Sequence, residues 1–139
     1  MSERREPRLR RWRLYNYKRE VKLSYEAAVE KVKAELKKEG FGVLTEIDVK
    51  ATLKAKLNVD FDRYVIVGAC NPPFAHQALQ AERDVGIVMP CNVVVYEMGG
   101  KTFVASTLPT VTMGVVGNPK LAPLAGQVEK KLKDAVDRV

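Results

Sequence analysis

The sequence predicts an α+β domain of two layers, in which a mostly antiparallel sheet is covered on one face by two long helices. Gly99 and Gly100 join two apolar, β-branched runs, and this is the strongest hairpin pattern in the chain. Two amphipathic segments of helical period lie near the two ends of the chain. The other helical segments are too short for full crossovers, so a doubly wound parallel sheet is the less favoured alternative.

Length and charge indicate one domain that follows a basic arm. The chain has 139 residues, of which 46% are hydrophobic and 29% charged, enough for one core. Residues 1–13 contain six arginines and two glutamates, so more than half of the net charge of +7 lies there. We therefore expect a flexible basic arm over residues 1–14 and a single α+β domain over 15–139. No apolar run approaches the roughly 20 residues that span a bilayer, which predicts a cytoplasmic protein without a membrane segment.

The first half of the domain predicts two strands, each followed by a helix. Polar and apolar residues alternate over 17–23, and Ser24 is a favourable N-cap for a helix that ends before Gly40. A second strand over 41–47 leads to Asp48, which is the N-cap of a short helix. The residues that this short helix is expected to bury are Val49, Leu53 and Leu57.

A third strand over 63–70 is nearly all apolar, so we expect it inside the sheet. Asn71 followed by Pro72 then predicts the start of a short helix that runs to about Ala81.

The second half ends with the hairpin and a long helix. Its strands are predicted over 86–97 and 102–108, and an ordered loop over 109–118 follows. Pro123 delays or kinks the terminal helix. The apolar stripe of this helix consists of Leu124, Val128, Leu132 and Val136.

The two cysteines mark the candidate site, because each precedes an asparagine where a β-branched run meets a turn. Cys70 and Cys91 are expected to be free thiols on one side of adjacent strands, near the helix that starts at Pro72. The positive end of that helix would lower a thiol pKa. The competing interpretation is that both cysteines are small buried hydrophobes beside ordinary turns. The candidate ligand-binding residues are Cys70, Asn71, Pro72, His76, Cys91 and Asn92.

His76 is the only histidine and offers two further interpretations. With Cys70 and Cys91 it would supply three ligands for zinc or a soft metal, and Glu97 or a solvent molecule would complete the shell. It would also serve as the base for a nucleophilic cysteine. The spacing supports both only weakly, since there is no Cys-x-x-Cys and no second histidine. Phosphate-loop and dinucleotide motifs are absent, and the sequence identifies no cofactor.

Several separated segments resemble one family. Residues 40–49, 68–73, 89–95 and 113–119 are similar to the bacterial and archaeal domain of unknown function 302, over about residues 15–138. The resemblance implies a compact α+β fold of the TATA-binding-protein-like arrangement, a homodimer, and no established activity. The arginine-rich start lies outside the family pattern.

Three functional hypotheses follow from these residues. The first is a small dimeric binding domain whose thiol-lined pocket takes a small molecule, a soft metal or a sulfur species. The second is a thiol-dependent enzyme that uses Cys70 or Cys91 with His76. The third, which the chain supports least, is association with nucleic acid through the arginine arm, with Trp12, Tyr15 and Tyr17 stacking on bases.

A homodimer is expected because helices on one face leave the other face of the sheet bare. Residues alternate along a strand, so one of two apolar sets must point outward. These sets are Val93, Val95 and Val104, and Val94, Tyr96 and Phe103.

Overall fold

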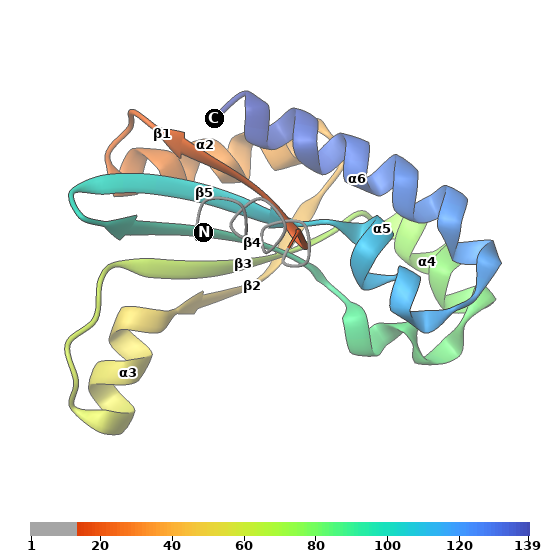
Figure 1. The fold of residues 1–139 in the computed structure, drawn as a ribbon, viewed down its shortest axis with the longest axis horizontal. Coiled ribbons are helices and arrows are strands. Elements are labelled where there is room, and N and C mark those ends of the chain that lie inside the picture. The colour runs from red at the N-terminus through yellow and green to blue at the C-terminus, as the bar shows by residue number, and fades with distance from the viewer. Residues whose placement is uncertain (1–13) are drawn as a thin grey trace, which may run out of the picture.

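Residues 14–139, which the computed structural model describes, contain five strands in one antiparallel sheet (Figure 1). The strands are β1 (Asn16–Val21), β2 (Gly42–Asp48), β3 (Tyr64–Cys70), β4 (Cys91–Met98) and β5 (Lys101–Thr107). Their order across the sheet is β1-β5-β4-β3-β2. The predicted α+β class and antiparallel sheet are confirmed. The basic arm was predicted over residues 1–14, and residues 1–13 lie outside the described part.

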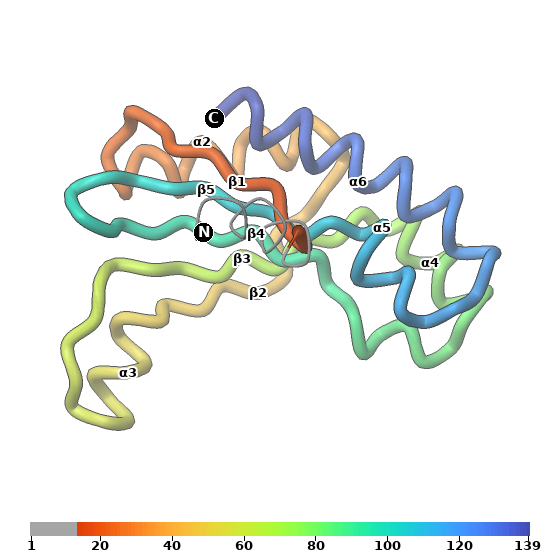
Figure 2. The backbone as a smooth tube through the Cα atoms, viewed as in Figure 1, coloured from red at the N-terminus to blue at the C-terminus, as the bar shows by residue number. Residues whose placement is uncertain are grey.

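The helical elements lie mainly on one side of the sheet and at one end of it (Figures 1 and 2). They are α2 (Tyr25–Lys38), α3 (Val49–Leu57), α4 (Pro72–Ala81), η1 (Arg83–Val88), α5 (Pro109–Thr112), η2 (Gly114–Val116), η3 (Pro119–Leu121) and α6 (Ala122–Asp137). Ser24 and Asp48 accept hydrogen bonds from helix N–H groups as predicted, and Gly40 adopts a φ of +87°. Across residues 14–139, no helix is both long and apolar enough to cross a membrane.

The hydrophobic core lies between the sheet and the two long helices. The register pairs Val65 with Val95 and Val67 with Val93, so these four side chains point to one face. They pack against the apolar stripes of α2 and α6 and are at most 4% exposed. Val93, Val95 and Val104 are therefore the inward set. The set with Val94, Tyr96 and Phe103 points to the open face.

A buried carboxylate fixes α2 against the C-terminal end of α6. Glu35 is 1% exposed and accepts hydrogen bonds from Arg138 Nε at 2.6 Å and from Lys38 Nζ at 2.9 Å. The bond from Arg138 is the main reason that the pKa of Glu35 falls to about 2, and Lys38 and Lys31 lower it further. The ionised carboxylate thus holds both helices over the core.

Three local predictions differ from the structure. Helix α3 buries none of its residues, and Leu57 is 66% exposed, because β2 and β3 carry α3 beyond the area that α2 and α6 cover (Figure 1). Residues 83–88 form a 3-10 helix, and β4 starts only at Cys91, after Pro90, which has no N–H for a sheet ladder. The predicted loop over 109–118 contains α5 and η2.

Candidate functional site

Both cysteines border one small cavity between the ends of β3 and β4 and the helix α4. Its volume is about 30 Å³, which is room for about one water molecule. The lining is almost wholly apolar and includes Phe41, Phe74, Ala78, Met89, Met113, Leu124 and Val128. The cavity resembles a packing defect in the core more than a ligand site.

The two thiols lie at neighbouring strand ends and line the same cavity, although the register offsets them by one position. Cys91 lies opposite Ala69, so its side chain points to the face that the helices cover, where it packs against the core. Cys70 is the last residue of β3, and it borders the same cavity although it follows Ala69 along the strand. Burial raises the pKa of the Cys91 thiol to about 11, and the neighbouring Cys70 adds to this rise. Cys91 is therefore protonated at neutral pH and is a poor nucleophile there.

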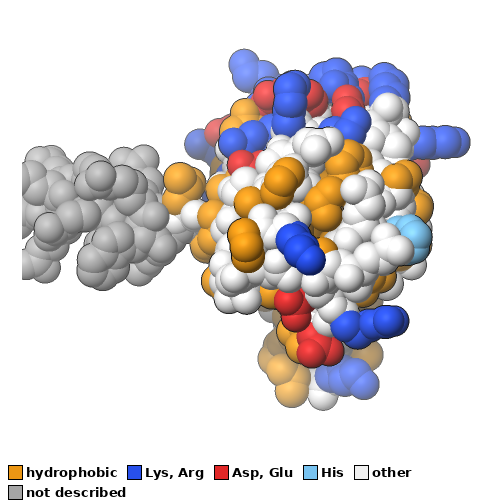
Figure 3. All heavy atoms as spheres, turned by 90° about the vertical axis from the view of Figure 1, so that its right-hand side faces the viewer, with side chains coloured by type: hydrophobic (Ala, Val, Ile, Leu, Met, Phe, Trp, Pro, Cys, Tyr) orange, Lys and Arg blue, Asp and Glu red, His pale blue; other side chains and the backbone are white. Residues whose placement is uncertain are grey.

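Of the other predicted site residues, Asn71 lines the cysteine cavity as well, whereas Pro72 and His76 do not. Asn71 is 8% exposed at the N-cap position of α4, but its Nδ2 donates to the carbonyl of Glu39 at 3.1 Å instead of capping the helix. Pro72 is the exposed first residue of α4. His76 is exposed on α4 and does not line the cysteine cavity; the pale blue histidine side chain in Figure 3 lies at the surface.

The described residues do not form the metal site that the sequence suggested. Within residues 14–139, no three His, Cys, Asp or Glu side chains come together as a metal ion would require. The structure thus does not assemble Cys70, His76 and Cys91 as ligands.

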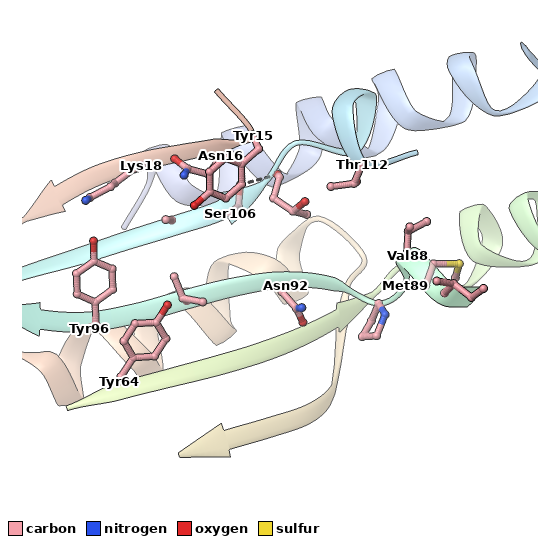
Figure 4. A pocket seen from close by; sticks show the side chains of 15 residues that line it. Tyr15, Asn16, Lys18, Tyr64, Val88, Met89, Asn92, Tyr96, Ser106 and Thr112 are labelled. Atoms are coloured by element: carbon pink, nitrogen blue, oxygen red, sulfur yellow. Dashed lines mark hydrogen bonds between the residues drawn. The ribbon is translucent and has the colours of Figure 1, made fainter. Parts of the chain in front are cut away.

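A much larger hollow lies on the face of the sheet that α2 and α6 leave open, and we call it the open-face hollow. Its volume is about 520 Å³, within the usual range for small-molecule sites. It is lined by Tyr15, Asn16, Lys18, Tyr64, Ile87, Val88, Met89, Pro90, Asn92, Val94, Tyr96, Ala105, Ser106, Thr107 and Thr112. Figure 4 shows Tyr64 and Tyr96 toward one end, and Val88, Met89 and Thr112 toward the other. Asn92, predicted as a partner of the thiols, lies here instead.

The register explains why these side chains meet. Tyr64 is paired with Tyr96, Val94 with Ala105, and Ala105 with Lys18, so side chains from four neighbouring strands point to the same face. The rings of Tyr64 and Tyr96 stack at 5.1 Å between centroids. The ammonium of Lys18 lies 5.4 Å from the centroid of Tyr96. Burial raises the pKa of Tyr64, so its hydroxyl is neutral and can donate a hydrogen bond at physiological pH.

Sequence reasoning found part of this hollow and missed the rest. It identified Val94, Tyr96 and Phe103 as one of two sets that could face outward. It missed Lys18 and Tyr64, because only the strand order brings β1 and β3 to the same surface. The sequence pattern that could have identified Tyr64 is one aromatic residue on each of three apolar strands, namely Tyr64, Tyr96 and Phe103.

The fold and this hollow define a small α+β domain with one covered and one open sheet face. The chain belongs to the family "Domain of unknown function DUF302", whose sequence model matches residues 17–139. A crystal structure of an uncharacterized conserved protein DUF302 from Bacillus stearothermophilus is similar to it, with 34% sequence identity and a TM-score of 0.85. That similarity covers 90% of this chain and 98% of the other. A comparison with curated proteins finds no match.

Proposed function

We propose that the protein is a small dimeric binding domain whose ligand site is the open-face hollow. The observation that carries this proposal is a 520 Å³ hollow on a sheet face without a helical cover, in which aromatic rings, amides and one lysine converge. Binding sites usually combine an apolar lining with a few placed polar groups in this way. The hollow is far larger than the 30 Å³ cavity at the cysteines.

The thiol hypotheses have less support as locations for function. A ligand at the cysteine cavity would have to open the core around Cys91. A Cys–His reaction would need His76 to approach a thiol, whereas His76 is exposed and outside the lining of that cavity. Nucleic-acid binding through the arginines of residues 1–13 stays a prediction, since those residues fall outside the described range.

The dimer is proposed from a segment that we call the β2–α3 arm, residues 42–62. None of these residues is buried. The segment nevertheless forms a seven-residue strand and a nine-residue helix. Its large exposed apolar residues are Val43, Leu44, Ile47, Leu57, Val59 and Phe61. A helix of this length is unstable in water without a partner surface, so the arm favours contact with another chain.

A second copy of this chain is the partner that fits the arm best. β2 is an edge strand without lysine or proline, which are two of the protections against edge pairing, and its two charges lie in its second half. If the two-fold axis of an antiparallel β2 pair passes through Thr45, Glu46 and Asp48 lie opposite the uncharged first half of the other strand, so like charges do not meet. If each of the six apolar side chains contributes about 100 Å², the arm offers roughly 600 Å² per chain, near the 800 Å² of a standard interface.

The dimer is tested by light scattering at micromolar concentration. We expect a dimer for the wild-type protein and a monomer for Ile47→Lys. The matched control is Val115→Lys, which removes another exposed apolar residue outside the arm and should leave the dimer intact. A monomeric wild-type protein would overturn the proposal. So would a dimer that is lost on Val94→Asp, because Ile47 lies on the same face of the sheet as Ile66 and Val94 and the open face would then be the interface.

The ligand site is tested by screening a library of small aromatic fragments with amide chemical-shift mapping. We expect hits whose shifts concentrate on Asn92, Val94 and Ala105. Asn92→Trp should abolish them, because the indole fills the hollow from an exposed position. His76→Trp is the matched control and should keep them. Hits that survive Asn92→Trp, or a screen that gives none, would contradict the proposed site.

A further inference from the structure

We infer that the open-face hollow takes a small molecule that joins a planar aromatic body to an anionic group. This inference rests on the proposed function and narrows its ligand class. It draws on the charge of the hollow, the geometry of its rings and the position of its amides.

The charge of the hollow favours an anion. Among the described residues, Lys18 is the only charged side chain that lines it, and no carboxylate does. Glu20 lies two residues along the same face of β1, but it approaches Lys101 at 3.9 Å and does not line the hollow. Within residues 14–139, no carboxylate forms an ion pair with Lys18, so its ammonium is available to pair with a ligand.

The rings favour a planar body. Tyr64, Tyr96 and Phe103 form a row across β3, β4 and β5, with successive centroids 5.1 Å and 5.4 Å apart. Val94 on β4 and Ala105 on β5 continue the apolar floor toward the other end of the hollow. A flat aromatic ligand can cover this floor and stack against an exposed ring edge or face.

The position of Lys18 brings the positive charge of the hollow next to its aromatic rings. The ammonium of Lys18 is held over Tyr96 and Phe103, at 5.4 Å and 4.7 Å from their centroids. In Figure 4 the Lys18 side chain extends from β1 at the border of the hollow, on the side where Tyr96 lies. A ligand that lies on Val94 and Ala105 can therefore bring an acidic group to Lys18 while the amides of Asn16 and Asn92 donate hydrogen bonds to its polar edge.

The experiment compares three molecules with the same ring system by isothermal calorimetry. These probes are 2-naphthoate, the neutral 2-naphthamide and the cationic 2-naphthylmethylammonium. We expect the naphthoate to bind about fivefold more tightly than the amide, as one partly exposed ion pair contributes, and the cation to bind most weakly. Lys18→Met should remove the preference for the anion. Lys22→Met, which removes an exposed lysine beyond the end of β1, should retain it.

The outcomes separate this inference from the proposed function. Equal binding of naphthoate and naphthamide, with both lost in Asn92→Trp, would overturn the anion preference and leave the hollow as the ligand site. Tighter binding of the cation would overturn it as well. If none of the three probes binds but fragments of another class shift Asn92 and Val94, the aromatic anion class is wrong and the site stands. If no molecule shifts those residues, both proposals fail.

Discussion

Helices α6 and α3 are both rich in lysine and both carry apolar residues, yet they are buried to very different extents. α6 buries five residues, Leu132 and Val136 among them, against the sheet and α2. α3 buries none, although it is ordered and follows a well-formed N-cap at Asp48. The edge strands next to them each contact a long helix. On β1, Arg19 donates to the Val136 carbonyl of α6 at 2.7 Å, and on β2, Glu46 pairs with Lys33 of α2 at 3.0 Å, so the contrast lies in α3 itself.

This difference shows that a helix in this fold is stabilised more by packing against the sheet than by its own hydrogen bonds. A helix of nine residues has too few internal hydrogen bonds to persist alone in water, while α6 gains its stability from the apolar surface that it buries. The β2–α3 arm thus gains little stability from burial within its own chain and is held mainly by the pairing of β2 with β3.

The largest expected effect separates the two helices directly. Leu132 is fully buried in the core, and Leu132→Ala should lower the free energy of unfolding by about 3 kcal/mol, because it removes methyl groups and leaves a cavity. Leu57 is 66% exposed, and Leu57→Ala should change the free energy by no more than about 0.5 kcal/mol. Urea unfolding measures both values. The Ile47→Lys background removes the proposed dimer from the comparison.

A large cost for Leu57→Ala in that background would contradict the contrast. It would mean that α3 packs within its own chain more closely than its exposure indicates. A cost that appears only in the wild-type background would instead assign the stabilisation of α3 to the second copy.

These helices also show how far the sequence could predict the fold. Apolar spacing located both helices, and the caps at Ser24 and Asp48 were read correctly from single residues. The same spacing predicted that Val49, Leu53 and Leu57 would be buried, which is wrong. Periodicity predicts which face of a helix is apolar. Whether that face of α3 is buried depends on how far β2 and β3 extend beyond α2, and no local sequence pattern encodes that distance.

A smaller effect is expected where the arm joins the rest of the sheet. A Cβ on Gly68 would lie 2.1 Å from Thr45 Oγ1 and 2.9 Å from the Cγ of Pro90, so β3 needs glycine where β2 and the start of β4 close over it. Gly68→Ala should therefore lower the free energy of unfolding by about 2 kcal/mol through overpacking. Thermal or urea unfolding at constant protein concentration checks this value.

Thr45→Ala provides the control, because it removes the closer of the two clashing atoms. The double variant should recover part of the loss, so that the two changes are not additive. Additive costs would show that the clash with Pro90, rather than the one with Thr45, decides the cost. Gly42→Ala is a matched glycine change on β2, and its new Cβ meets no atom within 4 Å.

The candidate site was harder to predict than the fold. Cys70, Asn71, Cys91 and Asn92 were grouped because they share a motif and lie near strand ends. The register separates Asn92 from the other three: Asn92 pairs with Gly68 and points to the open face, whereas Cys91 pairs with Ala69 and lines the small cavity together with Cys70 and Asn71. A shift of one residue exchanges the two faces of a strand, and sequence alone does not fix the register between β3 and β4.

The smallest expected effect concerns the Cys91 thiol and tests how closed the core is at its one-water cavity. In Cys70→Ser, which leaves a single cysteine, iodoacetamide should label Cys91 much more slowly in the native protein at pH 7.5 than in urea, because burial raises the thiol pKa to about 11. Mass spectrometry over time measures both rates. Prompt labelling of the native protein would contradict this prediction and return the thiol-lined pocket to consideration.

The same thiol gives a pH test with a defined sign. Its ordinary value is 9.0, so above about pH 9 the unfolded chain loses the proton while the folded protein keeps it up to about pH 11. Ionisation then favours the unfolded state, and stability should fall as the pH rises from 9 to 11. The double variant Cys70→Ser/Cys91→Ala lacks this thiol. Its free energy of unfolding should fall less between pH 9 and pH 11 than that of the parent Cys70→Ser protein. If the two profiles run parallel, Cys91 ionises as readily in the folded core as in water, and the core at the end of β4 is open to solvent.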